Sequence, residues 1–263
     1  MQLKAWVISL DDQNQTARNL IDYLQQNQVD VELFPAVDGR GRLPELHDNE
    51  SLNQAKARAH RRRDLTSSEI GCYLSHLRAI RKAYEQDVEY VALFEDDVIA
   101  EPDLASTIKE IATLPKEFHM VRLMELKPTK RKVIKLLGNQ HWLTRPLRGT
   151  LGTQGYVLNR QGMELVLDYG SEVCMPIDKL YDNFFMFGLH CYAIEPHVIH
   201  ETPSSSNVSK AGNLLSSPLA ILRWQMFKLH RSLRRRFYLL RHYSEMMPAE
   251  KCKTKPGKSA RMR

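Results

Sequence analysis

Long hydrophobic runs are missing from this sequence of 263 residues. No stretch approaches the roughly 18 to 20 uncharged apolar residues that a membrane-spanning helix needs, so we expect no transmembrane anchor. The apolar stretch near the N-terminus is short and runs directly into Asp11 and Asp12 with no small-residue cleavage site, so we expect no secretory signal. The four cysteines lie far apart and form no CxxC pair, which predicts reduced thiols in a cytosolic protein and no structural zinc site.

Several catalytic motifs are missing as well. The sequence contains no GxxxxGK[ST] or GxGxxG loop, which argues against a P-loop NTPase or a dinucleotide oxidoreductase, and it contains no GxSxG nucleophile elbow. Cys72 precedes His76 at helical spacing, a pairing that could make a thiolate, but a cysteine inside a helix is more often a packed core residue. Hydrophobic residues make up 43% of the chain and charged residues 26%, the composition of a folded globular protein.

Acidic residues are scarce at the C-terminal end. From residue 223 onward thirteen Lys and Arg face two Glu, a net charge of +11, so residues 1–222 carry −4 of the total of +7. A basic tail on a chain with clustered carboxylates leaves one competing interpretation, a metal-dependent nucleic-acid-binding protein or nuclease. The acidic body and the lack of a base-reading motif disfavour it, and we expect no nucleic-acid partner.

Short apolar runs alternate with helical patterns along the first 200 residues or so. Strands are predicted at 5–10, 29–34, 90–94, 120–126 and 191–199, with a further pair flanking Gly138 and Asn139. Helices are predicted at 16–26, 67–84 and 102–114, and the second begins with a capping box formed by Thr66 and Glu69. The alternation predicts an α/β fold with a mostly parallel sheet and helices on its faces.

Three consecutive carboxylates, Glu95, Asp96 and Asp97, follow the most apolar predicted strand. The carboxyl ends of strands are where open α/β sheets bind ligands. In an extended segment alternate side chains share a face, so Glu95 and Asp97 could point the same way. Two hard carboxylates on one side are plausible ligands for Mg²⁺ or Mn²⁺, and the alternative is a solvated turn that caps the next helix.

Six blocks occur in order along the chain: VISL at 7–10, FPAVDG at 34–39, LTSSEIGCYLSH at 65–76, LFEDDV at 93–98, GTQGYV at 152–157 and PID at 176–178. Together they resemble glycosyltransferase family 25, over roughly residues 1–208. The resemblance implies a GT-A-like fold, a mixed nucleotide-sugar-binding sheet flanked by helices, with a divalent metal, Mn²⁺ or Mg²⁺, near a DxD-type motif. It also implies inverting transfer of a hexose, galactose being favoured and glucose possible, from a UDP-sugar to the growing oligosaccharide of a lipooligosaccharide or lipopolysaccharide.

The resemblance also implies roles for individual residues. It places the metal on Asp97, Glu95 and His200. It places the donor near residues of the matching blocks, namely Ser9, Leu10, Ala36, Asp38, Ser75, His76, Glu95, Asp96, Asp97, Gly155 and Tyr156. Ser75 and His76 either reach the donor sugar or bond to neighbouring backbone, and Gly155 either allows close approach of a ligand or serves a turn.

Inverting transfer needs one base to take the proton of the acceptor hydroxyl. We choose Asp178 in the PID block, with Glu125 and Asp182 as rivals. The alternative for Asp178 is that it caps the helix that follows. The arginines at 58 and 61–63 either contact phosphate or carboxylate groups of the acceptor or form a solvated charge run.

The C-terminal segment has the pattern of a basic amphipathic helix. Its apolar residues step by three or four: Leu219, Leu222, Met226, Leu229, Leu233, Phe237 and Leu240. Its other faces carry Arg and Lys, which predicts that residues 219–241 bind an anionic membrane surface; the alternative is packing on the body or on another subunit. We therefore predict a catalytic domain at 1–208, a helical segment at 209–250 and a disordered tail at 251–263. The expected location is cytoplasmic, peripheral at the inner face of the bacterial cytoplasmic membrane, with a lipid-linked oligosaccharide as acceptor.

Overall fold

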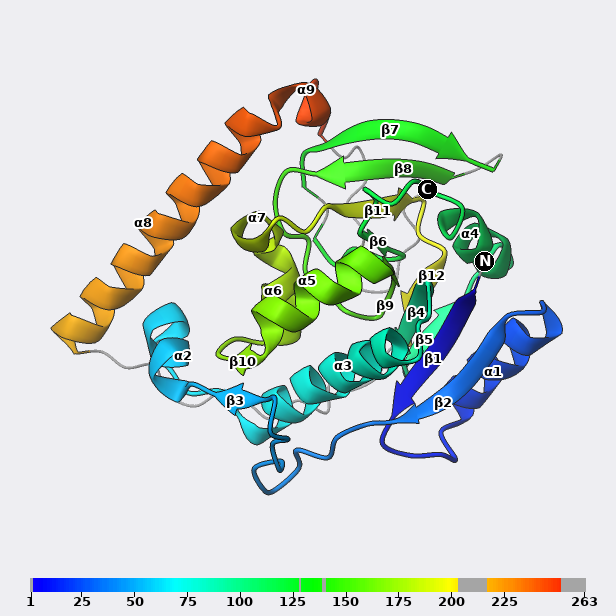
Figure 1. Cartoon of the computed structure of the whole chain (residues 1–263), viewed down its shortest axis with the longest axis horizontal. Helices are drawn as coiled ribbons and strands as arrows, with labels where there is room; N and C mark the ends of the chain where they lie inside the picture. The colour runs from blue at the N-terminus through cyan, green and yellow to red at the C-terminus, as the bar shows by residue number, and fades with distance from the viewer. Residues whose placement is uncertain (1, 128, 139–140, 203–216, 252–263) are drawn as a thin grey trace.

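An eight-stranded mixed sheet forms the centre of the computed structural model, which describes residues 2–127, 129–138, 141–202 and 217–251 (Figure 1). The strand order is β2-β1-β4-β9-β6-β11-β8-β7. Its strands are β1 (Leu3–Ser9), β2 (Asp30–Pro35), β4 (Tyr90–Glu95), β6 (Met120–Arg122), β7 (Arg131–Leu137), β8 (His141–Pro146), β9 (Gly155–Asn159) and β11 (Cys191–Glu195). β1 pairs in parallel with β2 and β4, whereas β9 runs antiparallel to β4 and β6. The predicted α/β fold with a mixed sheet is confirmed, with β4 in its interior as its apolar sequence indicated. The sheet is not mostly parallel, because four of its seven strand pairings are antiparallel.

Two small sheets lie outside the main one. One pairs β3 (Ser51–Leu52) with β10 (Glu172–Val173), and the other pairs β5 (Val98–Ala100) with β12 (Ile199–Glu201). The single strand predicted at 191–199 is therefore wrong. Pro196, which has no N–H for a ladder bond, follows the end of β11, and the chain then joins a different sheet.

Helices cover both faces of the main sheet. They are α1 (Gln15–Gln26), α2 (Gln54–Arg61), α3 (Ser67–Glu85), α4 (Leu104–Ile111), α5 (Arg160–Gly170), α6 (Ile177–Asp182), α7 (Phe184–Phe187), α8 (Pro218–Arg241) and α9 (Tyr243–Met246). The alternation of β1 shows the two layers: Ala5 and Val7 pack into one apolar cluster with α1 and α4, while Trp6 and Ile8 pack into another with α3 and α5. Residues 5–9 of β1 are buried, with alternate side chains on the two sides of the sheet.

The start of α3 fixes the helix against the end of β2. Thr66 accepts a hydrogen bond from the Glu69 N–H at 3.1 Å, and the Glu69 carboxylate accepts one from the Thr66 N–H at 3.0 Å, which completes the predicted capping box. Gly71 lies so close to the chain after β2 that a Cβ on it would stand 2.7 Å from the Val37 oxygen. This contact brings the middle of α3 next to the carboxyl ends of the strands.

Replacing Glu69 by glutamine should destabilise the fold in a pH-dependent way. Burial alone would raise the pKa of Glu69, but Arg63, the Thr66 N–H and Arg61 lower it to about 2. The pKa of Glu69 in the folded protein lies below its ordinary value of 4.5, so the ionised carboxylate stabilises the fold by roughly 3 kcal/mol at pH values above 4.5. This stabilisation is lost as the pH falls toward 2. Urea unfolding should show a lower free energy of unfolding for Glu69→Gln than for the parent at pH 7, and the difference should shrink at pH 3. A deficit of equal size at both pH values would contradict this assignment, because glutamine retains the capping oxygen.

The C-terminal helix α8 runs along one side of the molecule, beside α2 and α7 (Figure 1). Ser217 caps its N-terminus and Pro218 occupies its first turn. Its body-facing side holds Trp224, which lies under the Arg62 guanidinium at 4.9 Å, and Phe227, which stacks on His60 at 3.7 Å between ring centroids. The predicted helix is confirmed over the described residues. The first part of the predicted helical segment, residues 209–216, and nearly all of the predicted disordered tail lie outside them.

Candidate active site

The carboxyl ends of β1, β2 and β4 meet at one edge of the sheet. Ser9, the last residue of β1, lies with its Oγ 2.6 Å from Asp96 Oδ2, and its backbone oxygen accepts the Ala36 N–H at 2.8 Å. Ser9 is buried, whereas Ala36 and Asp96 are half-buried. Three of the predicted donor residues from separate blocks are therefore side by side, as parallel strands require.

Glu95 is held by the residues around it. Thr153 donates a hydrogen bond to Glu95 Oε1, His76 Nε2 lies 3.5 Å from the same oxygen, and the Glu95 N–H donates to the Gln154 oxygen at 2.9 Å. Burial alone would raise the pKa of Glu95, but His76 and Thr153 outweigh it and lower the pKa. Glu95 is thus an ionised, oriented carboxylate at neutral pH.

A chain of buried polar side chains supports His76 from behind. His76 Nδ1 lies 2.9 Å from the Tyr156 hydroxyl, which lies 2.7 Å from the Tyr181 hydroxyl. Tyr156 has no exposed surface, and burial raises its pKa well above 10, so it stays a neutral hydrogen-bonding group. His76 and Tyr156 therefore position Glu95, and among the described residues the polar contacts of the His76 ring are with these side chains and not with neighbouring backbone.

Asp97 is the carboxylate of this cluster with a buried oxygen, Oδ1, that accepts no hydrogen bond among the described residues. Burial, followed by the charges of Glu95, Glu201 and Asp96, raises its pKa from 3.8 to about 7. Crowded carboxylate oxygens of this kind are the ligands that Mn²⁺ or Mg²⁺ uses in proteins. The chemistry of these carboxylates therefore fits a divalent ion, which Asp97 and Glu95 would hold.

His200 does not join these carboxylates. On β12 it pairs with Ile99 of β5, and its Nδ1 lies 3.3 Å from Glu101. The charge of the next residue, Glu201, raises the pKa of Asp97 instead, because neighbouring strand residues point to opposite faces. In the part of the chain that the structure describes, the only group of three or more potential ligands within 4.8 Å is Cys72, His76 and Glu95. The predicted set of Asp97, Glu95 and His200 is not brought together.

Cys72 behaves as a packed residue despite its neighbours. Burial, Glu95 and Asp178 all raise the pKa of its thiol, so it remains protonated, as the core interpretation predicted. Its position is informative, because the charges of both Glu95 and Asp178 reach it. The donor-side carboxylate and the predicted base are therefore both close enough to Cys72 to raise the pKa of its thiol.

Two other predicted donor residues serve the fold. The Ser75 hydroxyl accepts the Val37 N–H at 2.8 Å and donates to the Gly71 oxygen at 2.7 Å, which is the backbone alternative stated for it. Gly155 sits in β9, where a Cβ would stand 2.5 Å from the Ile199 side chain, so its missing side chain makes room for protein rather than for a ligand. Neither residue has a group left to offer a donor.

Leu10 and Asp38 extend from the same edge into solvent. Leu10 follows β1 and is 40% exposed. Asp38 follows β2 and forms a two-bond ion pair with Arg40, at 2.8 and 2.9 Å, which lowers its pKa to about 2. Both remain predictions for the outer rim of the site.

Asp178 is the one candidate base with an accessible carboxylate. It lies in the first turn of α6, whose N-cap is Pro176, so the interpretation of Asp178 as the capping residue is wrong. Its side chain is 28% exposed and lies 3.8 Å from the Lys179 ammonium. Burial raises its pKa above the usual carboxylate range, which brings it closer to the value that suits a base at neutral pH.

The rival bases are both buried. Asp182 accepts from the Arg122 guanidinium at 3.2 Å and from the Leu151 N–H at 3.1 Å, an arrangement that anchors the loop before β9. Glu125 is 1% exposed, and burial together with Glu195 raises its pKa to about 7. Neither carboxylate has the exposed surface that contact with a sugar hydroxyl needs.

Comparison with known proteins places these blocks in a family. A family model described as glycosyltransferase family 25 (LPS biosynthesis protein) matches residues 2–181. The chain belongs to glycosyltransferase family 25. Its curated relatives include a lacto-N-neotetraose biosynthesis glycosyltransferase of Neisseria meningitidis serogroup B, 26% identical over 199 residues that cover 67% of this chain and 68% of the relative.

Two further comparisons extend this picture. A lipooligosaccharide biosynthesis protein of Haemophilus influenzae is 24% identical over 208 residues, 73% of this chain and 74% of that protein. Among solved structures, a glycosyltransferase involved in glycosylation of the major capsid of PBCV-1 aligns with a TM-score of 0.44 and 9% identity, over 87% of this chain and all of that one. The assignment to glycosyltransferase family 25 rests on the sequence match.

Sequence reasoning missed three residues of this family 25 site. They are Thr153, Tyr181 and Glu201, which support or face the carboxylates. Thr153 stood in the GTQGYV block, and strand alternation after Pro196 would have turned Glu201, rather than His200, toward Asp97. Tyr181 carried no sequence signal, because its contact with Tyr156 depends on the packing of α6 against β9.

Proposed function

We propose that the protein transfers a hexose, galactose in preference to glucose, from a UDP-sugar to the growing oligosaccharide of a lipooligosaccharide or lipopolysaccharide, with inversion at the anomeric carbon. The family supports sugar transfer, and the names of the two bacterial relatives support the class of product. The observation that carries the proposal is the buried, unpartnered oxygen of Asp97 among three further carboxylates at the strand ends.

The divalent ion belongs to this proposal. Asp97 and Glu95 would hold it, and when bound it would neutralise the charge that develops on the departing diphosphate. Ser9 fixes Asp96 beside them, and His76 with Thr153 fixes the Glu95 carboxylate. The protein's own contribution is a set of oxygens held in place before the donor arrives.

Asp178 is proposed as the base. Its carboxylate would accept the proton of the acceptor hydroxyl as that oxygen attacks the anomeric carbon from the face opposite the leaving diphosphate. A single base on that face is what one-step displacement with inversion requires. The exposure of Asp178 and its raised pKa support this role over Asp182 and Glu125.

The exposed face of α8 supports contact with an anionic membrane. Seven apolar side chains on it are more than half exposed: Leu219, Leu222, Met226, Leu229, Leu233, Phe237 and Leu240. The predicted stripe therefore does not pack on the body, which α8 instead contacts through other residues such as Trp224 and Phe227. Five exposed cations of the helix accompany the stripe: Arg223, Lys228, Arg234, Arg236 and Arg241. No helix among the described residues is long and apolar enough to cross a membrane.

Apolar stripe and cations together fit a helix that lies in the interface of an anionic bilayer. We propose on this basis that the protein works at the inner face of the bacterial cytoplasmic membrane, where a lipid-linked oligosaccharide would be presented to it. A second copy of the chain could also cover the stripe, and the experiment below distinguishes such a dimer from membrane binding.

Removing part of the stripe should abolish vesicle binding. Leu229, Leu233 and Phe237 replaced together by serine should weaken binding to vesicles containing phosphatidylglycerol by about 100-fold or more, because each side chain loses most of the gain from burial. Transfer to a soluble acceptor should be unchanged. The matched control replaces Leu43, Leu136 and Trp142, which are exposed elsewhere. Equal vesicle binding by both variants, or a dimer that only the α8 variant loses, would contradict the membrane assignment.

The proposed reaction is tested by UDP release. The full chain is incubated with Mn²⁺ and either UDP-galactose or UDP-glucose, with and without a lipid-linked oligosaccharide extract. We expect acceptor-dependent UDP release that a chelator abolishes, faster with UDP-galactose. Release from neither donor under these conditions would overturn the proposal.

A further inference from the structure

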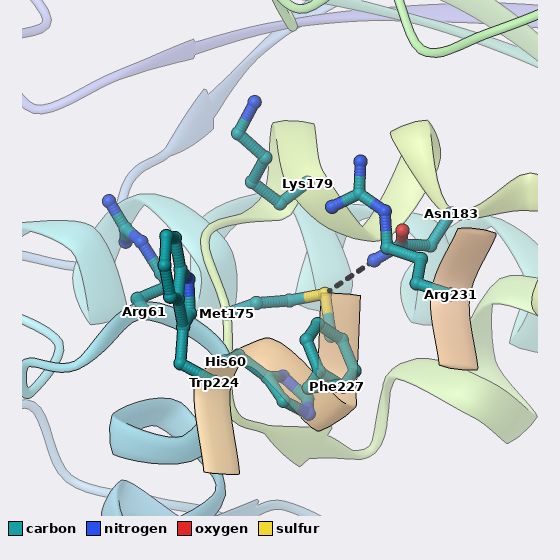
Figure 2. A pocket seen from close by; sticks show the side chains of 8 residues that line it. All are labelled: His60, Arg61, Met175, Lys179, Asn183, Trp224, Phe227 and Arg231. Carbon is teal, nitrogen blue, oxygen red and sulfur yellow. Dashed lines mark hydrogen bonds between the residues drawn. The ribbon is translucent and has the colours of Figure 1, made fainter. Parts of the chain in front are cut away.

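A cavity of about 250 Å³ lies between α2, α6 and α8 (Figure 2). His60 and Arg61 from α2, Lys179 from α6 and Arg231 from α8 contribute to its walls. Phe227 of α8 stacks on His60, so the docking of α8 on the body builds the cavity. The cavity therefore joins α2 to α6 and α8, which follow it by more than 100 residues in the sequence. Neither the proposed metal ligands nor the proposed base is among its lining residues.

The cavity is electropositive. Its lining includes three cations and no acidic residue. Arg61 and Lys179 have carboxylate partners, Glu69 at 2.8 Å and Asp182 at 3.5 Å, whereas Arg231 has none among the described residues. Burial and then the charge of Lys56 lower the pKa of His60 to about 4, and Arg231 contributes in the same direction. A half-buried arginine without a counterion in such a site favours an anion, and phosphate suits the guanidinium geometry.

The cavity also offers an unused hydrogen-bond acceptor. Asn183, 3% exposed, lines it and donates from Nδ2 to Met175 Sδ at 3.2 Å, as Figure 2 shows. Its Oδ1 is buried and has no partner among the described residues. A buried amide oxygen left without a donor is costly, and a hydroxyl group would satisfy it. The residues that line the cavity thus include both a cation without a counterion and an amide oxygen without a donor among the described residues.

We propose that this cavity is a subsite for a phosphorylated sugar unit of the acceptor. The phosphate is held by Arg231 and Lys179, and a ring hydroxyl donates to Asn183 Oδ1. Lys179 directly follows Asp178, and its ammonium lies 3.8 Å from the Asp178 carboxylate. An acceptor anchored here extends toward the proposed base. This inference rests on the proposed function, because it identifies the bound sugar phosphate as part of the acceptor. The binding itself does not depend on catalysis.

Calorimetric binding to the full chain tests the subsite with glucose 6-phosphate, glucose and inorganic phosphate as probes. Glucose 6-phosphate should bind about tenfold or more tightly than inorganic phosphate, because only the sugar can use Asn183, and glucose alone should bind more weakly still. Arg231→Gln should weaken glucose 6-phosphate binding by about tenfold or more, the loss of one charge-assisted pair. Arg234→Gln, an exposed arginine on the same helix that does not line the cavity, should leave it unchanged.

Two results would overturn the subsite. The first is equal affinity for glucose 6-phosphate and inorganic phosphate, which marks a mere anion site. The second is equal binding by Arg231→Gln and Arg234→Gln. Asn183→Ala gives a further check, since it should reduce the preference for the sugar phosphate over phosphate while the thermal unfolding of each variant reports its folding.

A phospholipid headgroup is the other source of phosphate beside this helix. If the cavity held a headgroup, Arg231→Gln would lose more vesicle binding than Arg234→Gln and glucose 6-phosphate would not bind, which would overturn the proposal. We expect Arg231→Gln to lose no more vesicle binding than Arg234→Gln, because Arg231 lines the cavity and Arg234 is exposed beside the apolar stripe. Failure of UDP release with retained sugar-phosphate binding would instead count against the proposed reaction alone.

Discussion

Replacing Asp97 by asparagine is expected to reduce sugar transfer by about 100-fold to 1,000-fold. The Asp97 carboxylate is the donor-side group with an unpartnered buried oxygen, and charge stabilisation by a bound ion contributes several kcal/mol to such reactions. The neutral amide keeps the shape of the side chain but loses the charge that holds the ion. The loss should appear in kcat/KM measured by UDP release at saturating Mn²⁺. Asp12→Asn, a nearby exposed carboxylate, serves as the matched control and should retain full activity.

The stability of Asp97→Asn separates this result from misfolding. The pKa of Asp97 is raised from 3.8 to about 7, so the folded protein holds that proton more tightly than the unfolded chain does. The bound proton therefore stabilises the folded protein at low pH, and this stabilisation is lost as the pH rises from 3.8 to about 7. At pH 8 without metal, the ionised Asp97 carboxylate destabilises the fold. Asp97→Asn should therefore unfold at the same or a higher temperature than the parent in metal-free buffer at pH 8. A lower unfolding temperature would assign Asp97 a structural role instead.

Replacing Asp178 by asparagine is expected to lower kcat by about 100-fold to 10,000-fold, the range for loss of a positioned base. Binding of UDP should not change, because Asp178 is not among the carboxylates proposed to hold the ion. The parent should lose activity as the pH falls through the raised pKa of Asp178, because the base must be ionised, and the variant should lack that limb of the profile. Steady-state kinetics across pH check both statements.

A matched control and a rival decide the interpretation of Asp178. Asp168→Asn removes an exposed carboxylate from α5 and should be neutral. If Asp178→Asn kept its activity and Glu125→Gln lost it, the base would be Glu125, and the acceptor would have to approach a carboxylate that is now 1% exposed. That outcome would contradict the proposed direction of acceptor entry.

Local signals in the sequence predicted the elements well. The capping box at Thr66 and Glu69 marks the start of α3 to the residue, because both hydrogen bonds involve residues three apart. The unbroken apolar run before Glu95 marks an interior strand, since a two-sided burial leaves no polar face. Pro196 was a visible signal as well, and reading it as a strand end would have separated β11 from β12.

The roles of side chains were harder to predict, because they depend on contacts between distant segments. Ser75 lies in a matching block, yet its hydroxyl is used by Val37 and Gly71. Tyr156 lies in another block and is wholly buried against His76 and Tyr181. Resemblance located the neighbourhood of the site, and only the packing shows which groups face a ligand and which hold those groups in place.

The helix α8 shows the same limit in a different form. Its sequence contains two apolar faces, and periodicity detects the row of Leu, Met and Phe without stating which face the body takes. The partners decide: His60 and Arg62 engage Phe227 and Trp224, which leaves the longer row in solvent. The exposed cations of α8 therefore accompany an exposed apolar surface.

Calorimetric titration of UDP, with and without Mn²⁺, tests the carboxylate site most directly. UDP should bind the parent and Asp178→Asn with similar affinity when Mn²⁺ is present, and should bind neither when a chelator is added. Asp97→Asn should show no Mn²⁺-dependent binding. Tight UDP binding to Asp97→Asn, or binding to the parent that Mn²⁺ does not affect, would contradict the assignment of this edge of the sheet as a metal-dependent donor site.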